Sequence, residues 1–146
     1  MKKRLTIIGF SCAACLIILA VVAGSAARRH AALVNCGNQM HSILLVSTML
    51  WPDEHDGRLP SNFISMSNEL ATPKILICPG DRSRKPAADW AVFGPEHCSY
   101  QIVAPGVKKS ETNTVFLRCP IHGYAGYVDD RLFDSSARLV RPQRIW

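Results

Sequence analysis

The stretch Leu5–Ala27, LTIIGFSCAACLIILAVVAGSAA, determines how this 146-residue chain is organised. It carries no charged residue and lies between two basic groups, Lys2–Arg4 and Arg28–His30. A helix needs about 20 predominantly apolar residues to cross the hydrocarbon core of a membrane. The run is long enough, so we predict a transmembrane anchor with its flanks in residues 1–30 and a separate domain in residues 31–146.

Two other interpretations of this segment remain open. A cleaved signal peptide has an apolar core of about 7–15 residues, which is shorter, but Ser25–Ala27 offers small residues to a peptidase. A lipoprotein signal needs small residues before a cysteine, and Ala13–Cys15 matches this loosely.

The favoured spanning helix has more positive charge before it than after it. The positive-inside rule then predicts a single-pass protein of the inner (cytoplasmic) membrane, with a cytoplasmic N-terminus and a periplasmic domain.

The positive charge is concentrated at the ends of the apolar segment. The chain has a formal net charge of +6, but from residue 31 onward 12 Lys and Arg accompany all 11 Asp and Glu. A nucleic-acid-binding domain carries its basic excess on the folded part. We therefore expect membrane lipid, and no nucleic acid, among the partners.

A helical pattern continues beyond the apolar segment. Apolar or small residues recur in steps of three and four, which is typical of one buried helix face: Leu33, Cys36, Met40, Ile43 or Leu44, Ser47 and Leu50. We predict one helix from about Leu5 to about Met49, ended by Trp51–Pro52 because proline lacks a backbone donor.

Short apolar runs between prolines and glycines follow this helix. They predict β-strands at Lys74–Cys78, Cys98–Val103, Thr114–Cys119, Tyr124–Val128 and either Arg131–Phe133 or Arg138–Val140. A short helix is expected at Ser65–Ala71, and a helical turn at Ala87–Ala91. The predicted fold class is α+β, in which a long N-terminal helix packs with its second half on a small antiparallel sheet.

Several short motifs occur in an order that resembles a known family. They are His55–Pro60 (HDGRLP), Cys78–Asp81 (CPGD), Cys98–Tyr100, Pro105–Gly106, Cys119–Gly123 (CPIHG) and Tyr127–Asp130 (YVDD). With the long helix, they resemble type IV pilins and type II secretion pseudopilins of the planctomycete and verrucomicrobial kind. The resemblance implies a pilin-like structural subunit of an envelope secretion or pilus-like assembly. It also implies other pilin-like or secretion-system subunits, or further copies of the chain, as partners.

The N-terminus departs from the pattern of that family. Pilin precursors have a glycine before the cleaved bond and then typically Phe-Thr-Leu-Ile-Glu. Here Arg4 stands at the glycine and Gly9 at the glutamate, while Thr6 matches. In the closing hairpin, Asp130-Arg131 replaces the Gly-His of the family. The prepilin peptidase site is therefore degenerate, and we expect no cleavage before Leu5.

The cysteines of the domain support two interpretations. Cys36, Cys78, Cys98 and Cys119 are candidates for one or two disulfides in an exported domain. The alternative is a zinc site on Cys78, Cys98, Cys119 and His122, since Cys119-Pro-Ile-His122 has ligand-like spacing. The alternative function is then a membrane-anchored extracytoplasmic binding module. Because the domain lacks a Cys-x-x-Cys pair, we favour disulfides and expect no metal or cofactor.

Catalysis has little support in the sequence. The chain has no phosphate-binding glycine loop, no Gly-x-Ser-x-Gly and no His-Glu-x-x-His. A Cys119 nucleophile with His122 is conceivable, but the position suits a turn equally well, so we expect no enzyme. Acidic residues that calcium could use are interpreted as solvated turns: Asp53, Glu54, Asp56, Asp129 and Asp130.

Overall fold

The computed structural model describes the backbone of residues 2–141 and the side chains of residues 18–141. The chain divides into two compact units, Met1–Ala31 and Ala32–Trp146. We call the second unit the head. The side chains of residues 5–17, which form the first part of the predicted membrane segment, lie outside the described residues.

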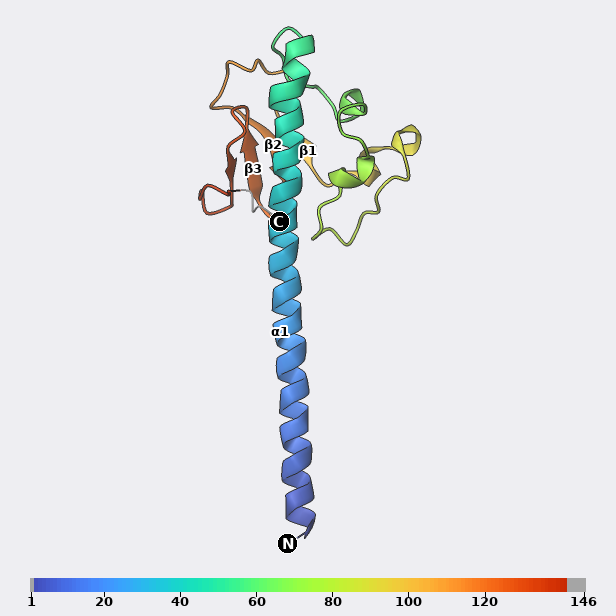
Figure 1. Cartoon of the computed structure of the whole chain (residues 1–146), viewed down its shortest axis with the longest axis vertical. Coiled ribbons are helices and arrows are strands. Elements are labelled where there is room, and N and C mark those ends of the chain that lie inside the picture. Colours follow the sequence, from blue (N-terminus) through green and yellow to red (C-terminus); the bar gives the residue numbers. More distant parts are fainter. Residues whose placement is uncertain (1, 142–146) are drawn as a thin grey trace. The chain divides into compact units, whose positions relative to one another are not determined.

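One long helix, α1 (Lys2–Leu45), passes through the first unit and enters the head (Figure 1). It continues as a π-helical turn, η1 (Val46–Leu50), and a 3-10 turn, η2 (Trp51–Glu54). Pro52, which supplies no backbone donor, lies in this last turn, and the helical run ends at Glu54. The prediction of one long helix is confirmed, but its turns continue two residues past the predicted stop at Trp51–Pro52.

In the first unit, the described apolar side chains of α1 are exposed. Ile18, Leu19, Val21 and Val22 are 62%, 65%, 61% and 59% exposed. At 100° per residue they point in more than one direction around the helix. Among the described residues, no helix combines the length and the apolar character that a membrane span requires.

The head contains a four-stranded antiparallel sheet in the order β1-β2-β3-β4. Its strands are β1 (Gln101–Ile102), β2 (Val115–Cys119), β3 (Tyr124–Tyr127) and β4 (Leu132–Phe133). The β2–β3 pairing matches Cys119 with Tyr124 and Leu117 with Gly126, with an irregularity between Val115 and Leu117. The predicted α+β class with a small antiparallel sheet is therefore confirmed.

The head part of α1 packs against this sheet. Cys36, Met40, Ile43 and Leu44 are completely buried. Gly126 of β3 faces Leu44 so closely that a Cβ there would lie 2.5 Å from Leu44 Cδ1. The remaining core comes from the loops and strands: Leu59, Phe63, Met66, Leu70, Leu76, Cys78, Tyr100, Phe116, Leu117, Cys119, Tyr124, Val128 and Leu132.

Segments between the helix and the sheet differ most from prediction. The predicted strand Lys74–Cys78 is wrong, because Pro73 and the Thr72 side chain, which accepts from Lys74 N, start the 3-10 helix η4 (Pro73–Leu76). The predicted helix Ser65–Ala71 is reduced to the 3-10 turn η3 (Ile64–Met66). Two further 3-10 turns are η5 (Trp90–Val92) and η6 (Pro95–His97).

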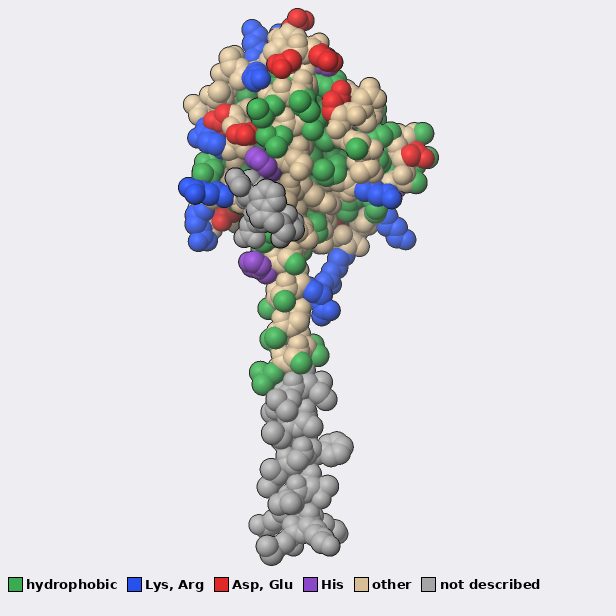
Figure 2. Space-filling model, viewed as in Figure 1, with side chains coloured by type: hydrophobic (Ala, Val, Ile, Leu, Met, Phe, Trp, Pro, Cys, Tyr) green, Lys and Arg blue, Asp and Glu red, His purple; other side chains and the backbone are tan. Residues whose placement is uncertain are grey.

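The predicted strands at the sheet edges are shorter than expected. Of Cys98–Val103 only Gln101–Ile102 pairs as a strand, because Ser99 N donates instead to Leu76 O on η4. At the C-terminal edge, Leu132–Phe133 is a strand and Leu139 adds an isolated bridge to Phe133. Acidic and basic side chains are interspersed over the visible face of the head (Figure 2).

The contact between α1 and β3 predicts opposite effects for two Gly→Ala changes. Gly126→Ala should destabilise the head by about 1–3 kcal/mol, because the added methyl group overpacks Leu44. Gly37→Ala should stabilise it by about 1 kcal/mol, because alanine is the better helix former and its methyl group would be in ordinary contact, 3.4 Å from Val140 Cγ1.

Urea unfolding of both variants of the full chain in detergent measures these effects. Equal changes in the free energy of unfolding for the two variants would contradict the close packing of α1 against β3.

Candidate functional site: a buried cysteine–histidine cluster

Three cysteines and one histidine meet inside the head. One ligand atom from each of Cys36, Cys78, Cys119 and His122 lies within 4.8 Å of all the others. Cys36 Sγ is 3.5 Å from Cys119 Sγ, and Cys78 Sγ is 3.2 Å from His122 Nδ1. The three cysteines are completely or almost completely buried. We call these four residues the cysteine–histidine cluster.

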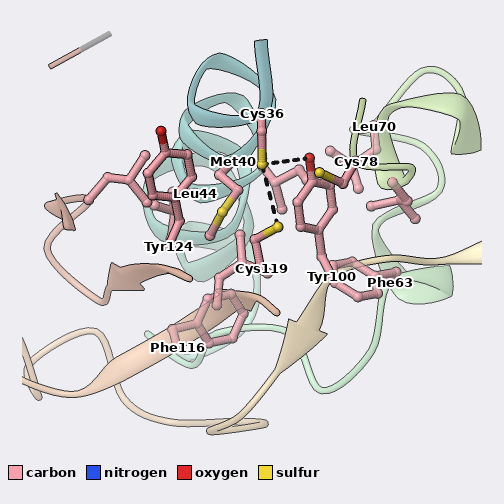
Figure 3. Close-up of a cluster of buried hydrophobic side chains, with 14 of the residues drawn as sticks. Cys36, Met40, Leu44, Phe63, Leu70, Cys78, Tyr100, Phe116, Cys119 and Tyr124 are labelled. Carbon is pink, nitrogen blue, oxygen red and sulfur yellow. Dashed lines mark hydrogen bonds between the residues drawn. The ribbon is translucent and has the colours of Figure 1, made fainter. Parts of the chain in front are cut away.

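Three separate segments supply the cluster. Cys36 comes from α1, Cys78 from the turn after η4, Cys119 from the end of β2, and His122 from the β2–β3 hairpin loop. Figure 3 shows the sulfur atoms of the three cysteines turned toward one another between the helix and the sheet. The segments are far apart in sequence, since 83 positions separate Cys36 from Cys119 and 44 separate Cys78 from His122.

Each loop residue of the cluster occupies a tight turn. Asp81 N donates to Cys78 O at 2.8 Å, and Gly123 N donates to Cys119 O at 2.9 Å. Gly123 has a φ of +70°, which favours glycine. These backbone bonds hold the Cys-Pro-Gly-Asp and Cys-Pro-Ile-His-Gly segments in the conformations that present their side chains.

Gly80 leaves the space that the His122 ring occupies. A Cβ at Gly80 would lie 2.7 Å from His122 Nε2 and 2.8 Å from His122 Cε1. Any larger residue would therefore push the ring away from Cys78. The absence of a side chain at Gly80 therefore makes room for the His122 ring. It is not required by the backbone conformation, because the φ of Gly80 is not positive.

Hydrogen bonds to sulfur favour a thiolate at Cys119. The Cys36 and Cys78 thiols hydrogen bond Cys119 Sγ and lower the pKa of the Cys119 thiol, and the N–H groups of His122 and Ile121 lower it further. The pKa of the Cys36 thiol is raised, first because it donates to Cys119 and also because it is buried. The two sulfurs that face each other therefore differ in the direction of their pKa shifts.

Tyr100 closes the cluster on the side of α1. Its hydroxyl donates to Gln39 Oε1 at 2.9 Å and lies 3.6 Å from Cys36 Sγ. Burial raises the pKa of Tyr100, which keeps the hydroxyl protonated. The phenol therefore separates the sulfurs from solvent on this side.

The structure brings together three of the four predicted zinc ligands. Cys78, Cys119 and His122 belong to the cluster. Cys98 does not, because its Sγ donates to Tyr100 O at 3.2 Å and burial raises its pKa to about 11. Cys36 takes the fourth place. Its position on the buried face of the predicted helix was the available signal, although nothing in the local spacing connects it with Cys119.

The other sequence candidates lie elsewhere. Cys36, Cys78, Cys98 and Cys119 are all free thiols in the structure, and their pairing in disulfides stays a prediction. Within residues 18–141, the acidic candidates for calcium form no comparable group of ligand atoms: Asp53, Glu54, Asp56, Asp129 and Asp130. The proposed nucleophile Cys119 is only 1% exposed.

Asp81 fixes the turn that carries Cys78. Its Oδ1 accepts from Ser83 Oγ at 2.6 Å and from Ser83 N at 2.9 Å. Its Oδ2 accepts from Ser99 Oγ at 2.8 Å and from Arg84 Nη1 at 2.9 Å. These bonds, first of all the one from the Ser83 hydroxyl, hold the pKa of Asp81 well below its usual range.

Asp81→Asn should destabilise the head near neutral pH by about 1–3 kcal/mol, because the donors on Ser83, Arg84 and the buried Ser99 lose a charged acceptor. A lowered folded pKa gives stability that is complete above the unfolded pKa, about 3.9, and is lost as the pH falls through the folded value. The difference between Asp81→Asn and the native chain should therefore shrink as the pH approaches about 2.

Urea unfolding at several pH values measures this. Asp53→Asn is the matched control, because the Asp53 side chain is 77% exposed, and it should change stability by less than about 0.5 kcal/mol. A pH-independent effect of Asp81→Asn would contradict the role of the carboxylate.

Comparisons with protein-family models, with curated proteins and with solved structures found no match to this chain. Its functional assignment therefore rests on its own residues and on the resemblance of its motifs.

Proposed function

We propose that this chain is a membrane-anchored, pilin-like structural subunit of an envelope secretion or pilus-like assembly. The observation that carries the proposal is the single helix α1 (Lys2–Leu45), which contains the apolar segment Leu5–Ala27 and whose later residues lie in the core beside a small antiparallel sheet. In this proposal the first unit holds the chain in lipid, and the head offers a surface to partners.

Exposed apolar side chains support the anchoring role. Ile18, Leu19, Val21 and Val22 are each more than half exposed, and they are not confined to one face of the helix. A helix that is apolar all round is buried in a large core or in a membrane. None of the described side chains of the first unit, from residue 18 onward, is buried, so lipid and neighbouring helices are the surroundings that this segment fits.

The head supports the structural role. Its sheet is a simple meander whose core contact is the buried face of α1, and the ligand atoms of its cysteine–histidine cluster lie among buried groups. The segment Asp56–Leu59 pairs with residues 107–109, since Leu59 N donates to Val107 O and Lys109 N donates to Gly57 O. Two of the motifs that resemble the pilin-like family, His55–Pro60 and Pro105–Gly106, thus lie next to each other in the head, where Arg58 Nη1 donates to Gly106 O.

Assembly would occur by lateral packing of helices. In lipid, helices associate through close contacts of small and β-branched residues, and such residues are frequent in Leu5–Ala27. The missing intramembrane glutamate, replaced by Gly9, removes one charge pairing that the resemblance would imply. Packing, rather than ion pairing, would then hold neighbouring subunits together.

The N-terminus of the membrane-bound chain tests how it is processed. Expressed in a bacterium that has a prepilin peptidase, the native chain should stay in the membrane fraction and keep Lys2–Arg4, because Arg4 replaces the glycine that the peptidase needs. Arg4→Gly is the matched variant and should be cleaved before Leu5. Intact-mass spectrometry distinguishes the two.

A native chain that begins at Leu5 would contradict the loss of processing. Cleavage after Ala26 or Ala27, with release from the membrane, would contradict the anchor itself.

Cross-linking tests the assembly. A photoreactive residue at Val22, which is 59% exposed, should give adducts with further copies of the chain or with other membrane subunits. The same residue at Lys108 on the exposed head surface is the control for random collisions and should give far fewer adducts. Adducts with lipid alone at Val22 would indicate an anchored monomer and contradict the structural-subunit role.

A further inference from the structure

We propose that Cys36, Cys78, Cys119 and His122 bind one structural zinc ion, which ties α1 to the two loops that pack beside it. The set consists of three thiols and one imidazole, the ligand types of Cys3His zinc sites. It is built from residues of the head alone and goes beyond the structural role proposed for the chain.

The distances suit a tetrahedron around zinc. Zn–S bonds of about 2.3 Å and Zn–N bonds of about 2.0–2.1 Å place two sulfurs about 3.8 Å apart, and a sulfur and a nitrogen about 3.6 Å apart. Cys36 Sγ and Cys119 Sγ lie 3.5 Å apart, and Cys78 Sγ and His122 Nδ1 lie 3.2 Å apart. Since every pair is within 4.8 Å, shifts of about 1 Å or less would complete the site.

The surroundings also match a metal–thiolate centre. The backbone N–H groups of Ile121 and His122 hydrogen bond Cys119 Sγ, and Gly80 N–H hydrogen bonds Cys78 Sγ. Hydrogen bonds of this kind orient ligands and balance the charge on the sulfurs. Gly80 leaves room for the His122 ring next to Cys78. Cys78, Cys119 and His122 are thus positioned by a second layer of contacts.

A disulfide would involve only two of the four side chains of this cluster. It would join Cys36 and Cys119 at about 2.05 Å and would leave Cys78 and His122 facing each other at 3.2 Å without a common partner. A single ion uses all four side chains. An iron–sulfur cluster would need ligand sulfurs farther apart, because its own iron and sulfide atoms lie between them.

The ligand set indicates a structural rather than a catalytic ion. Four protein ligands fill the tetrahedral coordination of zinc and leave no position for water or substrate, which is typical of structural sites. Two of the three segments that it would join, the turn after η4 and the β2–β3 hairpin, adjoin only short strands and 3-10 turns. Zinc would bind only the folded arrangement of these ligands, so the free energy of zinc binding would add to the stability of the folded head.

Metal analysis of the full chain tests the site. The chain is purified from membranes in detergent under reducing conditions, and its zinc content is measured by elemental mass spectrometry. We expect one zinc per chain. Replacement by Co²⁺ should give the intense visible bands of tetrahedral coordination and a sulfur-to-cobalt charge-transfer band in the near ultraviolet.

Matched variants identify the ligands. Cys36→Ser and Cys119→Ser should lose the stoichiometric zinc, whereas Cys98→Ser should keep it, because Cys98 lies outside the cluster. Gly80→Ala should weaken zinc binding about 10- to 100-fold through displacement of His122, the usual effect of disturbing the outer layer of a metal site. Zinc retained by Cys36→Ser would contradict the assignment of the fourth ligand.

A measurement on the native chain covers the case in which the variants do not fold. Alkylation should modify Cys98 to the same extent with and without metal, and should modify Cys36, Cys78 and Cys119 only after a chelator has removed the metal. The chelator should also lower the melting temperature, and added zinc should restore it. The proposal is overturned if the reduced chain takes up no zinc, or if Cys36 and Cys119 form a disulfide and the chain is fully stable without metal.

Discussion

The packing of the buried face of α1 against the sheet is the constraint on which the head depends. Cys36, Met40, Ile43 and Leu44 are completely buried along this face, and Leu44 reaches β3 at a position where only glycine leaves room. The sheet alone has strands of two to five residues, too short to form a stable layer by themselves. The helix therefore acts as the second layer of the domain, and its register decides which side chains meet the loops.

The position of the cysteine–histidine cluster follows from this packing. Cys36 lies one turn of α1 before Met40, so its thiol enters the same buried space that Cys119 enters from the end of β2. The thiols and the imidazole pair with one another there, Cys36 with Cys119 and Cys78 with His122, because unpaired polar groups are costly in a core. The Cys78 turn completes the group, and Asp81 anchors that turn through Ser83 and Ser99.

The first unit and the head place the same helix in different surroundings. Residues such as Ile18 and Val22 expose apolar surface, which lipid or another helix can cover, whereas Met40 and Leu44 are covered by the chain itself. In the proposed subunit, the first unit would be available for lateral packing, and the head would stay folded independently of the assembly. A metal that joins helix and loops would serve the second requirement without affecting the first.

The sequence by itself determined the long helix, its end near Trp51–Pro52 and the strands around Val115–Cys119 and Tyr124–Tyr127, because periodicity and proline act locally. It also singled out Cys78, Cys119 and His122. Only the tertiary structure decided that Cys36, rather than Cys98, joins them. That choice depends on the register of α1 against a sheet that lies 83 positions away along the chain, and no local spacing encodes it. The predicted strand Lys74–Cys78 was wrong for a related reason, since Thr72 and Pro73 start a 3-10 turn that overrides the β-propensity of its isoleucines.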